Sequence, residues 1–375
     1  MLIYGICGND TLLGALTGVI MFAFKHDYEK TMKRFDALMQ CEIYDRPPVN
    51  ITLEKDGYIP LSKKKYNCWE DMWMDFEFRT EEYIHKFSNT LYIGDSLPIA
   101  FPNMGPECFS AWCGCGYNYG ERTTWSEPII RNWETDYDKG KFDWEHPLLK
   151  KTIEFTDVLL DASEGRFLVG YTDFHPGGDH IAALREPQDL AMDMIDNVDY
   201  VKRKLAESYP DYFKMFDFFY EKLKAAGMPS STWLPLAFDG KLYVPSNDFS
   251  CMISKDTFDD IFLPGLIEEC RFFDRSIYHL DGPGALQHLD SLLEIKELNA
   301  IQWVCGSGNE GFKRWISVYK KIQQGGKALE IFLDVSDLDL LFENLKPEGI
   351  WIGGISGVDD EETADYVLKR VGQWK

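Results

Sequence analysis

His279 and Asp281 stand two positions apart at the end of a short apolar run. On a β-strand, side chains two residues apart point to the same side, so both groups would project into one pocket. An imidazole and a carboxylate arranged in this way can bind a divalent metal ion or act as an acid–base pair. The pair could instead only orient the glycine-containing turn at 282–284. We favour a functional role because the pair stands at a strand end.

Further polar residues follow other apolar runs. Asp248 could complete the site as a third carboxylate, or it could cap the following helix. Asp173 and His175 could contact a substrate, or they could form a turn and pack in the core. Cys305 is a candidate metal ligand together with His279, although a cysteine in such a position is more often a small buried apolar side chain.

Aromatic residues make up 15% of the chain, which is enough to line a pocket as well as fill a core. Most aromatic side chains in an α/β protein belong to the core. We expect Trp233, Tyr278 and Trp303 to contribute to an apolar pocket that binds the substrate, with core packing as the alternative for each. Asn247 joins them as a candidate hydrogen-bonding residue.

Eight short apolar runs predict the strands that position these residues. They lack strict alternation, which is typical of strands buried on both faces. Helix-length segments such as 254–271 and 359–371 separate them, so the sheet should be parallel. Eight such units favour an α/β (β/α)8 TIM barrel, in which functional residues lie at the carboxyl ends of the strands. The runs are 49–53, 97–102, 167–172, 233–244, 276–280, 300–304, 329–335 and 349–355.

The predicted barrel forms a single domain over residues 28–375, preceded by an N-terminal extension, 1–27, of unknown role. An apolar run at 11–24 is too short to span a bilayer and lacks the features of a signal peptide, so we expect a buried or interfacial segment. The segment 106–147 is an unusually long, aromatic connection between elements. Long connections of this kind often form lids or walls of a substrate site.

Composition narrows the class of protein. The 375 residues carry a formal net charge of −23, which disfavours nucleic acid and anionic membranes as partners. Nine cysteines include no Cys-x-x-Cys pair and fit free thiols in a reducing compartment, so we expect a soluble, cytoplasmic protein. The sequence contains neither a glycine-rich phosphate loop nor a Gly-x-Ser-x-Gly motif.

Three motifs resemble the uroporphyrinogen decarboxylase-like superfamily. They are Phe-His-Pro-Gly-Gly-Asp at 174–179, continuing to Arg185, then Asn-Asp-Phe-Ser at 247–250, and Tyr-His-Leu-Asp-Gly at 278–282. Segments 103–106 and 125–128 are similar to its uncharacterised bacterial members, and the likeness runs from about residue 28 to the end. The resemblance implies a (β/α)8 barrel. It also implies either uroporphyrinogen decarboxylation or zinc-assisted methyl transfer involving a corrinoid protein or a thiol.

The sequence departs from both branches of that superfamily. The decarboxylases carry several arginines near the first strand to bind a substrate with many carboxylates, whereas only Arg46 lies there in this chain. The methyltransferases carry His-x-Cys-Gly and a later cysteine as zinc ligands. Here Asp281 replaces the first cysteine and no cysteine follows Cys305. Oxygen ligands would suit a metal ion that acts as a Lewis acid better than one that activates a thiolate.

The leading hypothesis is a methyltransferase-like enzyme that moves a methyl group from a small methylated compound to a corrinoid protein partner. His279, Asp281 and Asp248 would be catalytic, and His279, Asp281 and Cys305 would hold a zinc ion. One alternative is a decarboxylase that acts on a carboxylated substrate or tetrapyrrole. Another is a non-catalytic barrel that binds a corrinoid or a tetrapyrrole.

Overall fold

A parallel five-stranded sheet forms one half of the molecule. The computed structural model describes residues 25–374, so the apolar run at 11–24 lies outside the described residues. The strand order is β13-β12-β11-β10-β9, with every neighbouring pair parallel. The four longest strands agree with the predicted runs to within one residue. The strands are β9 (Leu242–Tyr243), β10 (Arg275–Asp281), β11 (Ala300–Val304), β12 (Ala328–Asp334) and β13 (Ile350–Ser356).

The other strands are short and occur in pairs. One pair adjoins the sheet, because Val49 forms a parallel bridge to Ile352 of β13. Two other pairs are linked to each other, because the Tyr171 amide donates to the Ser231 carbonyl at 2.9 Å. The mixed α/β architecture is confirmed, whereas a closed eight-stranded barrel stays a prediction. The pairs are β1 (Asn50–Glu54) with β2 (Thr90–Gly94), β3 (Ile99–Ala100) with β6 (Leu168–Val169), β4 (Gly116–Tyr119) with β5 (Thr124–Glu127), and β7 (Ser230–Ser231) with β8 (Ala237–Phe238).

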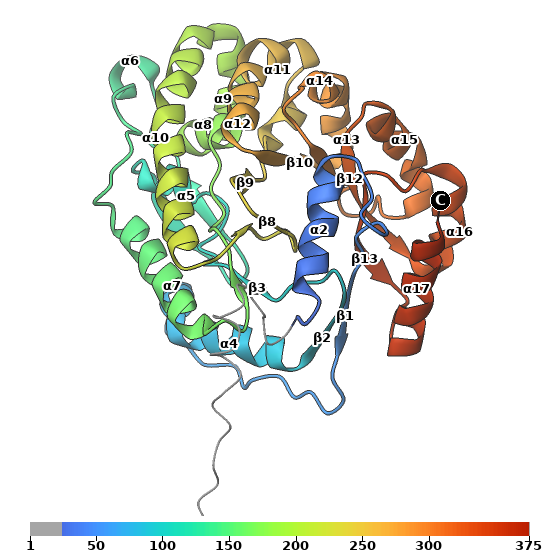
Figure 1. Ribbon diagram of the computed structural model, residues 1–375. Coiled ribbons are helices and arrows are strands. Elements are labelled where there is room, and N and C mark those ends of the chain that lie inside the picture. Colours follow the sequence, from blue (N-terminus) through green and yellow to red (C-terminus); the bar gives the residue numbers. More distant parts are fainter. Residues whose placement is uncertain (1–24, 375) are drawn as a thin grey trace, which may run out of the picture.

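Helices surround the strands, with α7 and α10 on one side of the molecule and α15 to α17 on the other (Figure 1). Within residues 25–374, no helix has both the length and the apolar character needed to cross a membrane. The helices are α2 (Tyr28–Met39), α3 (Trp69–Met74), α4 (Phe76–Ser88), α5 (Cys108–Trp112), α6 (Trp133–Asp136), α7 (Pro147–Ser163), α8 (Gly177–Arg185), α9 (Pro187–Asp196), α10 (Val198–Ala225), α11 (Lys255–Ile261), α12 (Leu263–Phe272), α13 (Gly282–Ala285), α14 (Leu289–Glu294), α15 (Ile316–Gln324), α16 (Leu338–Asn344) and α17 (Glu361–Gln373).

The helix expected at 254–271 is divided into α11 and α12. Ser254 caps α11 by accepting a hydrogen bond from the Thr257 amide at 3.2 Å. The break falls at Phe262, and Pro264 stands in the first turn of α12, where its missing amide hydrogen costs no helical hydrogen bond.

Helix α2 covers the amino ends of the strands. Its apolar face buries Phe35 and Leu38 against Ala300 and Ala328, the first residues of β11 and β12. Phe35 also meets Trp351 edge to face, with ring centroids 5.7 Å apart. The amino ends are therefore buried, and polar side chains are left to gather at the carboxyl ends.

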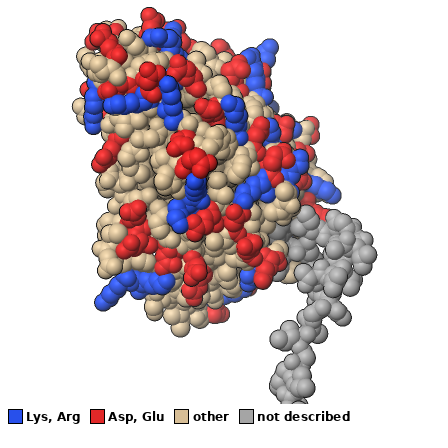
Figure 2. Space-filling view, turned by 90° about the vertical axis from the view of Figure 1, so that its left-hand side faces the viewer, with Lys and Arg blue, Asp and Glu red and all other residues tan. Residues whose placement is uncertain are grey.

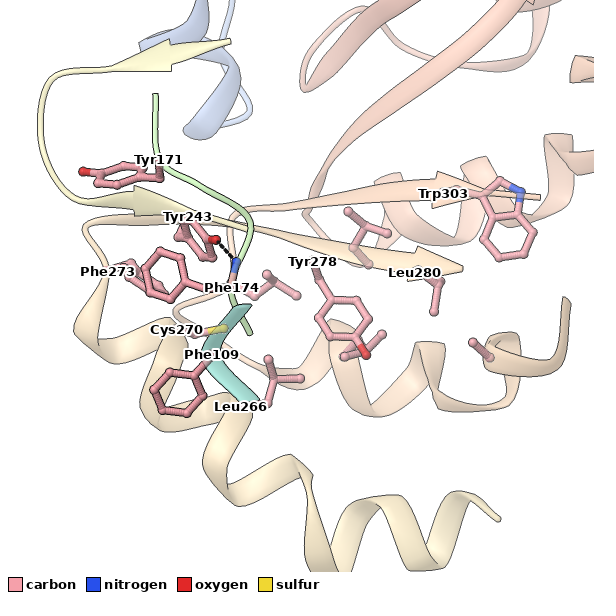
Figure 3. Close-up of a cluster of buried hydrophobic side chains, with 14 of the residues drawn as sticks. Phe109, Tyr171, Phe174, Tyr243, Leu266, Cys270, Phe273, Tyr278, Leu280 and Trp303 are labelled. Carbon is pink, nitrogen blue, oxygen red and sulfur yellow. Dashed lines mark hydrogen bonds between the residues drawn. The ribbon is translucent and has the colours of Figure 1, made fainter. Parts of the chain in front are cut away.

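An aromatic cluster lies between the strands and helix α12 (Figure 3). Phe216 of α10 packs edge to face on Tyr243 of this cluster. The Tyr243 hydroxyl accepts a hydrogen bond from the Phe174 amide at 2.9 Å and donates one to the Thr172 carbonyl at 3.0 Å. These two bonds hold the chain on both sides of Asp173 and so fix the loop that follows β6.

Charged side chains are scattered over the surface. On the face seen in Figure 2, acidic and basic residues lie among uncharged ones and do not gather into one large patch. This agrees with the even spread of charges along the sequence.

Candidate metal and substrate site

Asp248, His279 and Asp281 come together at the carboxyl end of β10. One ligand atom from each lies within 4.8 Å of the ligand atoms of the other two. His279 and Asp281 share one side of β10, as their spacing predicts, and Asp248 begins a short 3-10 turn after β9, the neighbouring strand. One imidazole and two carboxylates form a donor set that suits a divalent ion.

The turn that carries Asp248 is anchored by a buried carboxylate. Asp179 in the first turn of α8 accepts hydrogen bonds from the amides of Asp248 at 3.0 Å and Phe249 at 2.9 Å. The Ser246 hydroxyl lies 3.3 Å from Asp179 and 3.2 Å from Asp248. Asp248 therefore does not cap the next helix. Its side chain is free to face His279.

Negative charge at the site is poorly compensated. Burial raises the pKa of Asp179 to about 6, and the charge of Asp248 adds to this effect. Burial and Asp248 also raise the pKa of Asp281, while His279 opposes the rise. No Lys or Arg of residues 25–374 forms an ion pair with any of these three carboxylates. A bound cation would relieve this repulsion.

The orientation of His279 is set from the neighbouring strand. Its Nδ1 lies 2.6 Å from Oε1 of Gln302, which stands opposite it in β11. Because an amide oxygen only accepts hydrogen bonds, Nδ1 carries the proton in this arrangement. Nε2 then keeps its lone pair for a metal ion or a proton, as histidine ligands supported by a second residue do.

A buried glutamate lies beside Gln302 on the next strand, β12. Glu330 stands opposite Gln302 in β12 and is 2% exposed, and neither of its carboxyl oxygens has a hydrogen-bond partner of ordinary geometry among the described residues. Burial raises the pKa of Glu330 to about 8, and the Gln302 amide opposes the rise. Gly353 leaves room for the carboxyl group, because a Cβ there would lie 2.1 Å from Oε1.

A cavity of about 570 Å³ adjoins the candidate ligands His279 and Asp248. His279 and Asp248 line it, together with Trp233, whose ring meets the His279 ring edge to face at 5.3 Å. Glu107 and Ser126 also line it. The long connection at 106–147 thus supplies a wall of the cavity, as its length suggested.

His175 and Asp173 form an ion pair at the edge of this cavity. Nε2 of His175 lies 2.6 Å from the Asp173 carboxylate, and the His175 side chain is 10% exposed. Burial alone lowers the pKa of His175, but the charges of Asp173, Asp179 and Asp248 raise it to about 9. His175 is therefore an imidazolium at neutral pH, and its charge offsets part of the negative field.

A second cavity, of about 720 Å³, lies on the side of β1 and β13. Its lining includes Asn50, Tyr92 and Gly353. Trp233 lines both cavities, so its indole forms a shared wall between them.

The structure does not bring four of the predicted site residues to the cluster. Tyr278 points from β10 toward the helices, and Trp303 also packs on the helix side, 5.0 Å from Trp315 (Figure 3). Both are buried, because strand residues that alternate with site residues face the opposite way. Asn247 packs against Gly178, and Cys305 is outside the metal-ligand group, in which Asp248 is the third member.

The sequence did not lead us to predict three residues of the site: Asp179, Gln302 and Glu330. A signal for two of them was present, since Gln302 and Glu330 interrupt otherwise apolar strands. A polar residue inside such a strand needs a hydrogen-bond partner to be buried, and for Gln302 this partner is His279, one strand away.

Comparison with known proteins supports the fold alone. No family model matches the sequence, and no curated protein matches it. A solved structure described as a methyltransferase from Methanosarcina mazei is similar over 91% of this chain and 97% of its own. The TM-score is 0.56 and the sequence identity 12%. The chain therefore shares its overall fold with a methyltransferase structure, and membership of the uroporphyrinogen decarboxylase-like superfamily stays a prediction.

Proposed function

We propose that this protein is a methyltransferase-like enzyme that moves a methyl group from a small methylated compound to a corrinoid carried by a partner protein. The observation that carries the proposal is the convergence of Asp248, His279 and Asp281 within 4.8 Å, of which Asp248 and His279 line a cavity. The likeness of the fold to a methyltransferase structure supports it.

The donor set fits a divalent metal ion such as Zn²⁺. His279 offers Nε2 because Gln302 occupies Nδ1, and the carboxylates of Asp248 and Asp281 repel each other in the absence of a cation. Bound there, the ion would act as a Lewis acid toward the heteroatom that carries the methyl group. In the transfer the bond from methyl carbon to heteroatom would break with its electron pair left on the heteroatom, and the methyl carbon would bond to the cobalt of the partner's Co(I) corrinoid, which supplies the new electron pair.

The cavity walls would hold the methylated compound. Trp233 offers an apolar surface beside His279, and the His175 imidazolium supplies a fixed positive charge on the same cavity. An apolar wall facing a few charged groups orients a small substrate while most of its surface is removed from water.

A decarboxylase that acts on a multiply carboxylated substrate finds less support. Such an enzyme would carry several cationic residues near the first strand, whereas this chain has only Arg46 there. The Arg46 side chain already forms an ion pair inside the protein. Arg46 lies 2.6 Å from the fully buried Asp95, which Arg34 also contacts at 2.8 Å. These two arginines therefore neutralise an internal carboxylate, and neither guanidinium group is free to bind a substrate near the first strand.

The test combines metal analysis with a transfer assay. We expect the purified protein to bind one divalent ion per chain. We also expect it to transfer methyl groups from at least one of a set of methylated amines, alcohols and thiols to free cob(I)alamin, followed by absorbance. His279→Ala should lose both the metal and the transfer while remaining folded.

A variant at a second histidine controls for effects that any replacement of histidine by alanine would have. His26 is exposed, so His26→Ala should keep metal content and rate unchanged. Equal metal content and equal rates in His279→Ala and the parent protein would refute the proposed role. Carbon dioxide release from a carboxylated substrate without metal would favour the decarboxylase instead.

A further inference from the structure

A third cavity, of about 960 Å³, lies away from the proposed metal site. Residues 63–69 form one side of it, and side chains from α3, α4 and the turn between β4 and β5 form the rest. Neither the metal ligands nor His175 line it. It is therefore a separate site that the proposed methyl transfer does not use.

The lining of this third cavity is cationic in a strongly acidic chain. Lys63, Lys64, Lys65, Arg79 and Arg122 line it, against two carboxylates, Glu82 and Glu121. The whole chain carries a net charge of −23. Positive charge concentrated in a concave site on such a protein focuses the local field and attracts anions.

Arg79 is the clearest sign that an anion belongs there. Its guanidinium donates to the carbonyls of Trp73 and Asn103 and lies over the rings of Trp73 and Phe155, 5.3 and 4.6 Å from their centroids. No carboxylate among the described residues forms an ion pair with it, and burial lowers its pKa. The backbone and ring contacts fix its position, and Glu82 offsets its charge in part without forming an ion pair with it.

The lysines and Arg122 extend this positive surface toward solvent. Lys64 pairs with Asp75 at 2.6 Å, whereas Lys63, Lys65 and Arg122 form no ion pair with any residue of 25–374. Unpaired donors around a fixed guanidinium are suited to a ligand that presents several anionic oxygens.

Aromatic side chains complete the lining. Trp69 is 47% exposed although it lines the cavity, and Tyr66 also lines it. A large exposed ring next to unpaired cations offers a stacking surface for a flat ligand.

We propose that this cavity binds a small molecule that combines several negative charges with a flat ring, of the class of a nucleoside phosphate. The anionic end lies against Lys63, Lys65, Arg122 and Arg79, and the ring packs on Trp69.

Calorimetric titration of the full chain with ADP, tripolyphosphate and adenosine tests both halves of the proposal. We expect ADP to bind, and to bind more weakly as salt rises. The triple variant Lys63→Ala, Lys65→Ala, Arg122→Ala should weaken ADP and tripolyphosphate at least tenfold. Trp69→Ala should weaken ADP and leave tripolyphosphate unchanged.

A second triple variant controls for net charge. Lys313, Lys346 and Lys369 are exposed and lie outside the cavity, so their replacement by alanine should leave ADP binding unchanged. Absence of ADP binding, or equal weakening by the two triple variants, would overturn the site. Equal loss of ADP and tripolyphosphate binding in Trp69→Ala would overturn the role of the ring. Thermal unfolding of each variant verifies that the fold is kept.

Discussion

Replacing Glu330 by glutamine should make the protein more stable at high pH. The carboxyl group is buried, its oxygens lack ordinary hydrogen-bond partners, and its pKa is raised from 4.5 to about 8. The folded protein therefore holds this proton more tightly than the unfolded chain. Stability from this group is full below pH 4.5 and is lost as the pH rises to about 8.

The size of the effect follows from the two pKa values. At about 1.4 kcal/mol per pKa unit, the rise from 4.5 to about 8 corresponds to roughly 5 kcal/mol of unfolding free energy. Glutamine has nearly the same shape and does not ionise. The unfolding free energy of Glu330→Gln relative to the parent should therefore increase by about that amount between pH 4 and pH 9.

Urea unfolding at several pH values measures this difference. Other titrating groups contribute equally to both proteins, so they cancel in the comparison. Glu343→Gln is a suitable control, because Glu343 is an exposed residue on α16. A difference between Glu330→Gln and the parent that stays constant from pH 4 to pH 9 would refute the reasoning.

Three further predictions concern the residues that support the candidate metal site. Gln302→Ala should weaken divalent metal binding about 10- to 100-fold, because the residue holds the His279 ring; unchanged affinity in a metal titration would contradict this. Gly178→Ala should destabilise the fold by about 1–3 kcal/mol in urea unfolding, since its Cβ would lie 2.2 Å from a neighbouring amide oxygen, whereas Gly372→Ala has open space and should not. Asp248→Asn should lower the pKa of Asp179 from about 6, as followed by NMR titration of its carboxyl carbon, and an unmoved pKa would exclude Asp248 as a cause.

Much of the strand pattern could be read from the sequence. The strands from 275 to 356 are continuous apolar runs in which burial on both faces leaves a strong signal. The first half of the chain was harder, because its strands are as short as two residues and are stabilised by loops and bridges. Hydrophobic pattern alone does not define such segments.

The candidate site could likewise be predicted only in part from the sequence. His279 and Asp281 could be paired from their spacing, because a strand has a fixed period. Asp248 could be named but not chosen over Cys305, since that choice depends on a turn held by Asp179, far away in the sequence. Long-range contacts of this kind have no local sequence pattern.

The site takes its ligands from one strand and one adjoining turn, and both backbones are held by interactions that do not involve the ligand atoms. Strand pairing holds β10, and the amides after Ser246 are bound by Asp179. Side chains at 248 and 281 can therefore be exchanged without remodelling the chain beneath them. During evolution such a scaffold can move between hard oxygen and soft sulfur ligands by single substitutions, so that metal preference and reaction chemistry diverge while the architecture persists.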